Sequence, residues 1–494
     1  MLDKWQTVWV DVGPPAIIES LLVKGSYPSE IGFENVGPPS SFGTRITDEA
    51  LNRILRWYLE RAERLGFPFA SARVENIHLT EIRDTSFAVV EIGLELGSPG
   101  VIVDLQVEGN TRTTLSTIVR ETRVHPGDRY TDGLPATVQH RLLRSQLFSS
   151  VPEPNVLDHG SEGVSLLINV TEGTHNSFDG ILGYLPGTTT GGSGTVMGLV
   201  NVQFGNILGT GRRMSARWYR ENQSNQEIDL HYTEPWVANL PVHLTGGIFQ
   251  RKQDSSFVKE RVEGDVQVLL SDEVSIGALF SQSSVVPTAG YGATVSPESK
   301  NRSFGVSLRY DTRDRPVNPR YGALYATDYL RGSKSTSAPF LTPAYSEAST
   351  ERYEFDVQFY YPAGSNQVAA VEMHGKSYSA STMDASDLFL VGGTTTIRGY
   401  REGQFRGNRI AWMNLEYRFL TGGESSVFAF VDAGYIALRG DRLIGLTESE
   451  LSAVGYGLGV LSESPLGVLG VSIAFGKGDA FGDGKLHVRL YNRF

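Results

Sequence analysis

The residue with the clearest capacity for chemistry in this sequence is an arginine near the end of the chain. Arg398 lies in the stretch LVGGTTTIRGYREG (residues 390–403), and Glu416 and Asp432 follow in the next two segments. A guanidinium held between carboxylates in a partly desolvated space forms charge-assisted hydrogen bonds, and either partner left alone there is costly. What Arg398 does therefore depends on whether the fold brings these three side chains together.

Signatures of enzymes and of metal sites are mostly absent. GKS at residues 375–377 is not a phosphate-binding loop, because the glycine required five residues before its own glycine is Ala370. GYGLG at residues 455–459 fails the dinucleotide pattern, and GGSG at Gly191 lacks the second glycine of a nucleophile elbow. The nine histidines are scattered, and there is no cysteine. We therefore predict no catalytic residue, no metal site and no cofactor.

Composition and charge restrict the class of protein further. Among 494 residues there are 55 glycines, 21 tyrosines and 23 phenylalanines, a mixture that suits many short strands and turns. No run of about 18 apolar residues predicts a membrane helix. The net charge of −11 argues against a nucleic-acid-binding protein, which would normally carry a basic patch. The first residues lack the basic start and apolar core of a signal peptide, so either the protein is cytoplasmic or the sequence is mature or truncated.

The first third of the chain alternates strand and helix patterns. In residues 47–66 the apolar side chains recur at helical spacing after a potential N-cap, Thr47. Strand patterns precede and follow this helix, and the plan then repeats, so we predict two β-α-α-β-β units at residues 16–99 and 100–175. Residues 7–13, TVWVDVG, look like the closing strand of a third unit. We interpret residues 1–15 as the remnant of an upstream unit or linker.

From residue 176 to the end, helical patterns give way to strict alternation in segments of about ten residues. In RYEFDVQFYY (residues 352–361) the aromatic and apolar side chains share one face, and Glu354 and Asp356 share the other. A soluble sandwich would also alternate, but a charged second face in strand after strand favours a membrane barrel with a polar interior. We count about sixteen candidate strands, an even number as in bacterial barrels. The predicted fold is α+β units followed by an all-β transmembrane barrel of antiparallel strands over residues 176–494.

The alternation also predicts which side chains point inward. In VFAFVDAGYIA (residues 427–437) every second residue from Val427 is apolar, so Asp432 points into the barrel. The same parity turns Glu416 inward. The glycines Gly455, Gly457 and Gly459 share an inner face, where they would leave room for a loop.

Several motifs, in order along the chain, resemble those of one family. IRGY (residues 397–400) resembles the loop-tip motif of the BamA/TamA superfamily of barrel-assembly and translocation proteins, and VEGNTRT (107–113) and LLRSQLFSSV (142–151) resemble pieces of its POTRA domains. The remaining motifs are NILGTG (206–211), YTEPWV (232–237), YDTRDRPVNPRYG (310–322), NLEYRF (414–419), FVDAGY (430–435) and YGLGVLSESPLGVLGVSIAFGKG (456–478). The chain is thus identified as a member of this superfamily that is most similar to BamA-type or TamA-type proteins, truncated at its N-terminus.

The resemblance implies that a loop at residues 380–408, after the eleventh strand, folds back into the barrel. Arg398, Gly399 and Tyr400 would then be held inside, with Arg398 paired to Glu416 and Asp432. The last strand resembles the terminal insertion signal of outer-membrane barrels; its expected residues are Leu486, Val488, Leu490 and Phe494.

The family also implies a function. POTRA domains in the periplasm would capture unfolded client strands by edge pairing. They would deliver these strands to a seam in the outer-membrane barrel between residues 178–185 and 485–494, where nearby glycines weaken the pairing. Partners would be outer-membrane or secreted clients, outer-membrane lipid and periplasmic accessory proteins, with no nucleic acid. One alternative is a two-partner secretion transporter that exports a dedicated exoprotein. Another is a passive porin, although a simple pore needs no soluble arm.

Overall fold

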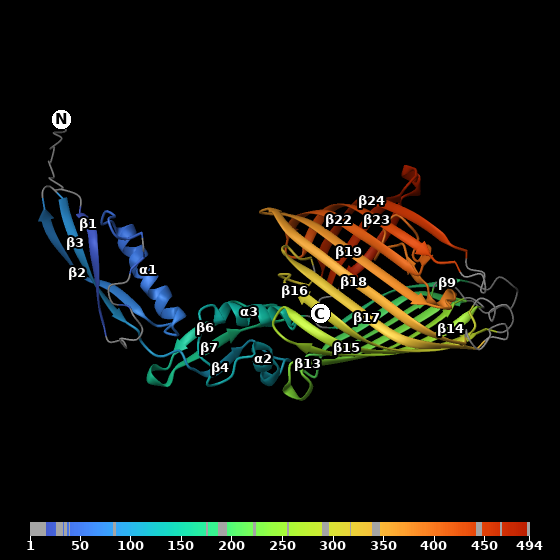
Figure 1. The fold of residues 1–494 in the computed structure, drawn as a ribbon, viewed down its shortest axis with the longest axis horizontal. Coiled ribbons are helices and arrows are strands. Elements are labelled where there is room, and N and C mark those ends of the chain that lie inside the picture. The colour runs from blue at the N-terminus through green and yellow to red at the C-terminus, as the bar shows by residue number, and fades with distance from the viewer. Residues whose placement is uncertain are drawn as a thin grey trace. The chain divides into compact units, whose positions relative to one another are not determined.

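The computed structural model of the chain divides into two compact units (Figure 1). One unit contains residues 1–110, 118–142 and 150–171, and the other contains residues 111–117, 143–149 and 172–494. The structure describes residues 16–25, 33, 37–38, 40–82, 85–173, 176–185, 195–220, 224–253, 256–288, 296–316, 318–337, 346–440, 447–464 and 467–491. The interpretation of residues 1–15 lies outside this range. None of the helices in the described part is long and apolar enough to cross a membrane.

The first domain-like element of the chain is a three-stranded sheet with one described helix. Its elements are β1 (Ala16–Lys24), α1 (Asp48–Arg64), β2 (Ser71–Ile82) and β3 (Thr85–Glu95). The strand order is β1-β3-β2, with β1 parallel and β2 antiparallel to β3. The strand β2 is therefore an edge strand of this sheet.

Helix α1 forms where the spacing predicts it and packs one face on this sheet. The Thr47 side chain caps it by accepting a hydrogen bond of 3.1 Å from the Ala50 N–H. Ile54, Tyr58 and Ala62, spaced four residues apart, are buried against the sheet, where they join a core that includes strand residues of β1 and β3. Apolar burial on one helix face thus fixes the helix to the sheet.

The second element repeats the mixed sheet with two α-helices. Its elements are β4 (Ile102–Glu108), α2 (Leu115–Thr122), α3 (Leu134–Arg144), β5 (Phe148–Ser150), β6 (Asn155–Asp158), the 3-10 turn η2 (Gly160–Glu162), β7 (Val164–Asn169) and β8 (Thr171–Glu172). The sheet order is β4-β7-β6, with β4 parallel to β7. The domain boundaries at residues 99 and 175 stay a prediction.

A buried carboxylate orders the loop that follows β4. The Glu172 side chain accepts hydrogen bonds from the Thr111 hydroxyl at 2.6 Å and from the backbone N–H groups of Arg112 and Thr113 at 3.0 and 2.6 Å. Burial alone would raise the pKa of Glu172, but these hydrogen bonds outweigh it and lower the pKa below the usual carboxyl range. The VEGNTRT motif is thus a carboxylate-binding loop within the fold.

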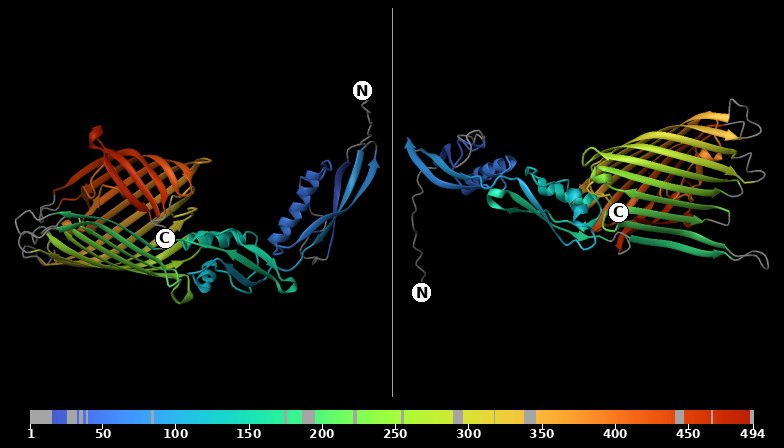
Figure 2. Two further views of the ribbon diagram at one scale, coloured as in Figure 1. Left: turned by 180° about the vertical axis from the view of Figure 1, so that it is seen from behind. Right: turned by 90° about the horizontal axis from the view of Figure 1, so that it is seen from below.

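The remaining strands form one sixteen-stranded antiparallel sheet, the β-barrel (Figures 1 and 2). They are β9 (Asn176–Leu185), β10 (Thr195–Ile207), β11 (Arg212–Arg220), β12 (Gln226–Glu234), β13 (Val242–Gln253), β14 (Phe257–Leu269), β15 (Val274–Pro287), β16 (Glu298–Asp311), β17 (Gly322–Ser337), β18 (Glu347–Gly364), β19 (Gln367–Ala380), β22 (Arg409–Gly422), β23 (Ser425–Leu438), β24 (Ser449–Ser464), β25 (Gly467–Gly476) and β26 (Lys485–Tyr491). Short 3-10 turns, η3 (Val237–Asn239) and η5 (Phe481–Asp483), lie between strands. Among the described residues the sheet ends on β9 and β26, each with a single neighbouring strand.

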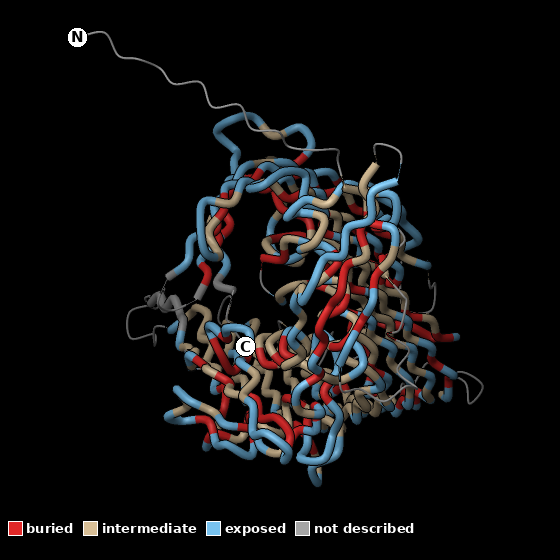
Figure 3. Tube along the Cα trace, turned by 90° about the vertical axis from the view of Figure 1, so that its left-hand side faces the viewer, coloured by how far each residue is buried: buried red, intermediate tan, exposed pale blue. Residues whose placement is uncertain are grey.

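Burial alternates along strands such as β16 and β23, as the sequence parity predicts, and buried and exposed segments follow one another along the chain in Figure 3. On β16, for example, Phe304 and Val306 are exposed outward at 66% and 62%. On β23 the outward residues Val427 and Val431 are exposed, whereas Phe428, Phe430 and Asp432 are buried on the inner face. An apolar outer face and a polar inner face are what lipid on one side and a lumen on the other require.

The chain between the eleventh and twelfth strands of the sheet, β19 and β22, forms the segment that we call the lumen loop (residues 380–408). It contains the 3-10 turn η4 (Ala385–Asp387) and a short hairpin of β20 (Phe389–Val391) and β21 (Phe405–Gly407). The stretch that carries Arg398 is the turn region of this hairpin.

Candidate functional site

Arg398 is bound to two acidic side chains of the inner wall, and we call Arg398, Glu416 and Asp432 the loop anchor. Its Nε and Nη2 donate to the two Asp432 carboxylate oxygens at 2.8 and 2.7 Å, and its Nη1 donates to Glu416 at 2.7 Å. The backbone N–H of Arg398 donates to the same Asp432 carboxylate at 2.9 Å. This is a bidentate pair reinforced by a second carboxylate, the arrangement that the guanidinium fork suits.

The anchor is almost fully removed from solvent. The exposed fraction is 7% for Arg398 and 0% for Asp432. Glu416 lies on β22 and Asp432 on β23, two strands paired so that Asn414 stands opposite Asp432. Because the charges are buried, removing one partner would leave an uncompensated charge in a desolvated site.

Two phenylalanine rings lie beneath the guanidinium. Its carbon is 3.6 Å from the Phe430 ring centroid and 5.8 Å from that of Phe428, so a cation–π interaction adds to the ion pairs. Gly459 of β24 makes room for the Phe428 ring, which a Cβ there would approach to 2.3 Å. At Gly457 a Cβ would lie 2.0 Å from the Ile473 carbonyl oxygen of β25 and 2.8 Å from the Phe430 ring, so this glycine makes room for the neighbouring strand as well as for a ring.

The third inner-face glycine makes room for the loop itself. A Cβ on Gly455 would lie 1.8 Å from the Arg398 carbonyl oxygen, which no real structure tolerates. Gly399 of the loop has φ of +90°, and a Cβ there would meet the Phe475 carbonyl group at 2.6 Å. The loop backbone and the wall backbone are thus in close contact at two glycines, Gly399 in the loop and Gly455 in the wall.

Tyr400 fixes the loop to the strands beyond the anchor. Its hydroxyl donates to the Val454 carbonyl at 3.0 Å and accepts from the Lys477 backbone N–H at 3.2 Å. Its ring packs on Phe405 with centroids 4.9 Å apart. All three residues predicted in the loop, Arg398, Gly399 and Tyr400, are therefore in contact with the wall or the hairpin.

An apolar cluster inside the barrel accompanies the charges. Ile397 of the loop is fully buried and packs in a cluster with Val391, Trp412 and Ile436. Gly434 has no side chain and so leaves space for the terminal methyl group of Ile397. Burying such side chains stabilises the loop position by about 1.5–3 kcal/mol each. The sequence parity did not reveal this cluster.

The anchor continues along the wall as a chain of alternating charges. Arg418 donates to the second oxygen of Glu416 at 2.7 Å and lies 3.5 Å from Glu372. Glu372 in turn accepts a hydrogen bond of 2.8 Å from the Tyr360 hydroxyl. Glu416 is therefore shared by two arginines, so it would keep one partner if Arg398 were lost.

A second ion cluster holds the start of the lumen loop, and sequence reasoning missed it. Lys334 of β17 donates to Asp384 and to Asp387, each at 2.6 Å, and we call these three residues the root clamp. Lys334 is 2% exposed. The two aspartates also form the capping box of η4, so the same carboxylates shape the turn and bind the lysine. The pattern DASD (residues 384–387) is the signal that could have predicted this turn.

Replacing Lys334 with methionine is expected to release the root of the loop. Methionine fills similar volume but leaves two buried carboxylates without their cation, a loss of about 3–5 kcal/mol in such sites. Hydrogen exchange of the η4 segment should therefore rise by about 100-fold or more. Adding Asp384→Asn and Asp387→Asn should recover most of the protection; no recovery would contradict the charge argument.

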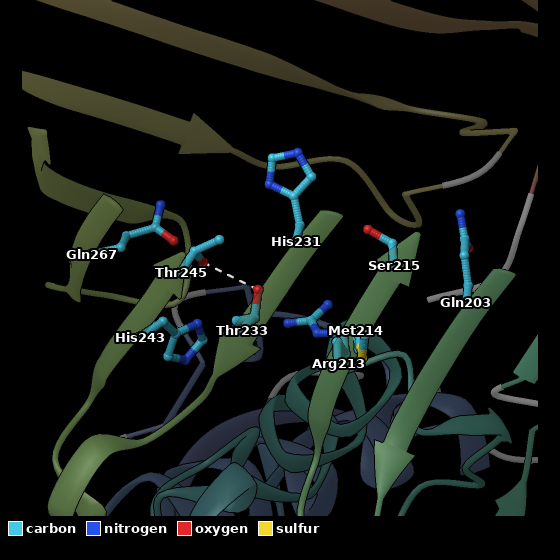
Figure 4. A pocket seen from close by; sticks show the side chains of 9 residues that line it. All are labelled: Gln203, Arg213, Met214, Ser215, His231, Thr233, His243, Thr245 and Gln267. Atoms are coloured by element: carbon cyan, nitrogen blue, oxygen red, sulfur yellow. Dashed lines mark hydrogen bonds between the residues drawn. The ribbon is translucent and has the colours of Figure 1, made fainter. Parts of the chain in front are cut away.

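Two of the cavities in the described part of the barrel lie along its inner wall. The larger, about 610 Å³, is lined by loop residues and by basic side chains, among them Arg251, Lys376 and Arg406. The smaller, about 320 Å³, is lined by nine mostly polar side chains from β10 to β14, with Thr233 and Thr245 hydrogen-bonded at 3.1 Å (Figure 4). Polar cavities of this kind are what a hydrated lumen requires.

The predicted terminal signal is only partly within the described structure. Leu486 and Val488 of β26 are exposed outward at 66% and 49%, as the alternation predicts. Leu490 pairs with Leu469 in the ladder, and Phe494 lies outside the described residues. The role of these residues in insertion stays a prediction.

A sixteen-stranded barrel with an arginine-anchored lumen loop, preceded by POTRA-like sheets, defines a class of outer-membrane proteins. The Omp85 superfamily domain matches residues 206–490, more than half of the chain, and the surface antigen variable number repeat of the POTRA family matches residues 101–173. The chain belongs to the Omp85 superfamily, of the BamA/TamA type. It is thus an outer-membrane protein whose POTRA domain lies in the periplasm, and its family is a class of non-enzymatic assembly and transport proteins.

Two curated relatives match at low identity. The outer membrane protein assembly factor BamA of Nitratidesulfovibrio vulgaris is 23% identical over 340 residues, which are 63% of this chain and 40% of that protein. The chloroplastic outer envelope protein 80 of Arabidopsis thaliana is 21% identical over 467 residues, 87% of this chain and 60% of that protein. The chain thus spans about half the length of these relatives.

Solved structures share the fold. BamA of Haemophilus ducreyi lacking POTRA domains 1–3 matches with a TM-score of 0.52 at 16% identity, covering 96% of this chain and 98% of that one. CdiB of Escherichia coli matches with a TM-score of 0.54 at 11% identity, covering 98% and 91%. At these identities the likeness concerns the fold alone.

Proposed function

We propose that this protein assembles client proteins into the outer membrane. Client strands would first pair with open sheet edges of the POTRA domains and then with the barrel seam between β9 and β26. The observation that carries the proposal is that β9 and β26 are the two edge strands of the described sixteen-stranded sheet. An unpaired strand edge is a template for another strand, and main-chain pairing tolerates many client sequences.

The unit at residues 16–99, which we predict to be a POTRA domain, has an edge that suits the first step. The strand β2 has one neighbour in its described sheet, and Leu79 and Ile82 on it are exposed at 62% and 55%. Apolar side chains along an open edge favour extended, apolar client segments.

The seam is suited to the second step because its last strand, as far as the structure describes it, is short. The strand β26 spans Lys485–Tyr491, whereas β18 spans Glu347–Gly364. Fewer ladder hydrogen bonds hold a short edge strand, so it costs less to separate than a central one. The proposal is therefore that the barrel opens sideways at β26.

Covalent closure of the seam is expected to stop assembly. The chain has no cysteine, so one cysteine at Leu486 combined in turn with one at each of residues 180–184 gives clean candidates for a seam disulfide. The assay follows a urea-unfolded eight-stranded client barrel that is added to vesicles containing the protein. The variant whose two cysteines form a disulfide should no longer insert this client. Activity should return on reduction. The readout is the gel mobility of the folded client.

A matched control uses two strands that stay paired. Val460 and Val471 face each other across β24 and β25, so a disulfide there should leave insertion unchanged. Full insertion activity in the oxidised seam variant would refute lateral opening.

Export of one dedicated protein through the lumen is the second candidate. The lumen loop occupies the interior at the loop anchor and the root clamp, so export would require the loop to leave. Cross-linking cysteines at Lys334 and Asp384 with a short bifunctional reagent separates the two functions. This tether fixes only the root of the loop and leaves the tip at residues 394–400 free to move, so assembly at the seam should survive it, whereas export should not.

A further inference from the structure

The lumen loop also contacts the last strand of the barrel, through a histidine that the sequence motifs do not include. His487 lies on the inner face of β26 and is 7% exposed. Its Nε2 accepts a hydrogen bond of 3.0 Å from the backbone N–H of Gly399, and its Nδ1 lies 3.1 Å from the Thr394 hydroxyl. Both partners belong to the stretch that carries Arg398.

Two consecutive peptide groups of the loop therefore bind two different strands. The N–H of Arg398 donates to Asp432 on β23, and the next N–H, that of Gly399, donates to His487 on β26. The strands β24 and β25 lie between them in the sheet. Each peptide group is planar, and these two groups are joined at the Cα of Arg398. Moving the Arg398 backbone away from Asp432 would therefore also move the Gly399 N–H that donates to His487.

The hydrogen bond from Gly399 determines which nitrogen of the His487 ring carries a proton. A backbone N–H can only donate, so Nε2 must be without a proton, and the ring proton lies on Nδ1, directed at the Thr394 hydroxyl. Arg398 and Lys485 are the cations near this ring, and Asp432 is the nearby anion. The link thus requires a neutral ring, or another side chain that presents an acceptor at the same place.

We propose that His487 is a positioning residue that couples the loop anchor to the seam strand. While Arg398 is in place, the loop holds β26 in the sheet; when the loop tip leaves, β26 loses a bond that its single neighbouring strand cannot replace. The histidine therefore makes loop release and seam opening one event. This inference rests on the proposed function for its biological purpose, but the coupling itself is a property of the barrel.

Hydrogen exchange of the whole chain in nanodiscs tests the coupling without any client. The segments followed are β26 and the loop tip, in the parent and in His487→Leu. Losing one buried hydrogen bond should speed exchange in both segments by about fivefold. His487→Gln, whose amide oxygen can accept from Gly399, should retain most of the protection. Val488→Ala, which alters the outward face of the same strand, should leave the loop tip unchanged.

A double-mutant cycle with Arg398→Ala provides the decisive comparison. If the two residues act through one link, adding His487→Leu to Arg398→Ala should produce no further increase in β26 exchange. If the increases in β26 exchange caused by Arg398→Ala and by His487→Leu multiply in the double variant, the proposal is overturned. It is also overturned if His487→Leu speeds exchange in β26 but not in the loop tip. If the cycle shows coupling but none of these variants changes client insertion, the inference stands and the proposed function fails.

Discussion

Arg398→Ala is expected to release the lumen loop from the barrel wall. The substitution leaves Asp432 buried without its cation, and breaking a buried pair in this way costs about 3–5 kcal/mol. It also removes the cation–π contact with Phe430. Hydrogen exchange of residues 390–403 should therefore rise by about 100-fold or more, and client insertion should fall.

Three variants separate the anchor from general damage to the loop. Arg406→Ala removes an exposed arginine of the same loop and should have little effect. Arg398→Lys should recover only part of the protection, because one ammonium cannot replace a guanidinium fork that binds two carboxylates.

The combination Arg398→Met with Asp432→Asn should be milder than Arg398→Ala. It removes both charges of the pair, and Glu416 keeps Arg418 at 2.6 Å. A double variant as unprotected as Arg398→Ala would contradict the view that a stranded charge dominates the loss.

Gly455→Ala is expected to have the second largest effect. A single methyl group would stand 1.8 Å from the Arg398 carbonyl oxygen, and the loop backbone must retreat to accept it. Overpacking usually costs about 1–3 kcal/mol, and here the retreat also lengthens the hydrogen bonds of the anchor. The loop segment should lose protection although no anchor residue has changed.

Other glycines give the matched series for this prediction. Gly246→Ala on β13 has no atom within 4 Å of the new carbon, so it should be neutral. Gly459→Ala meets only the Phe428 ring, at 2.3 Å, and should be intermediate because a ring can tilt where backbone cannot. Equal loop exchange in all three alanine variants would argue against a steric fit between Gly455 and the loop.

Parity and motif order together predicted the fold, and parity turned Glu416 and Asp432 toward the inner face, where Arg398 contacts both. Alternation has a period of two, so once Val427 and its neighbours are assigned to lipid, the inward direction of Asp432 follows from the sequence alone. The number of strands followed from the same pattern, and the position of the loop after the eleventh strand from the family resemblance. These features were accessible because each depends on local sequence or on residue order.

The contacts that sequence reasoning missed depend on distant pairing. Lys334 is one lysine in a polar strand end, and nothing near it in the sequence indicates that Asp384 will lie 2.6 Å away. The alternation in the last strand turns His487 inward. Its partner Gly399 can be identified only when it is known how far the loop reaches into the barrel. Gly457 and Gly459 were expected to clear space for the loop, but a Cβ at Gly457 would meet the Ile473 carbonyl oxygen first, and one at Gly459 would meet the Phe428 ring.

The central claim is that Arg398 holds the lumen loop inside the barrel, and the labelling rate of one buried cysteine tests it most directly. Ile397 is fully buried beside the anchor, and the chain contains no other cysteine. In Ile397→Cys, the thiol should react slowly with a membrane-impermeant maleimide when Arg398 is present. The labelling rate should be about 100-fold higher when Ile397→Cys is combined with Arg398→Ala. Equal labelling rates in the two backgrounds would contradict the account.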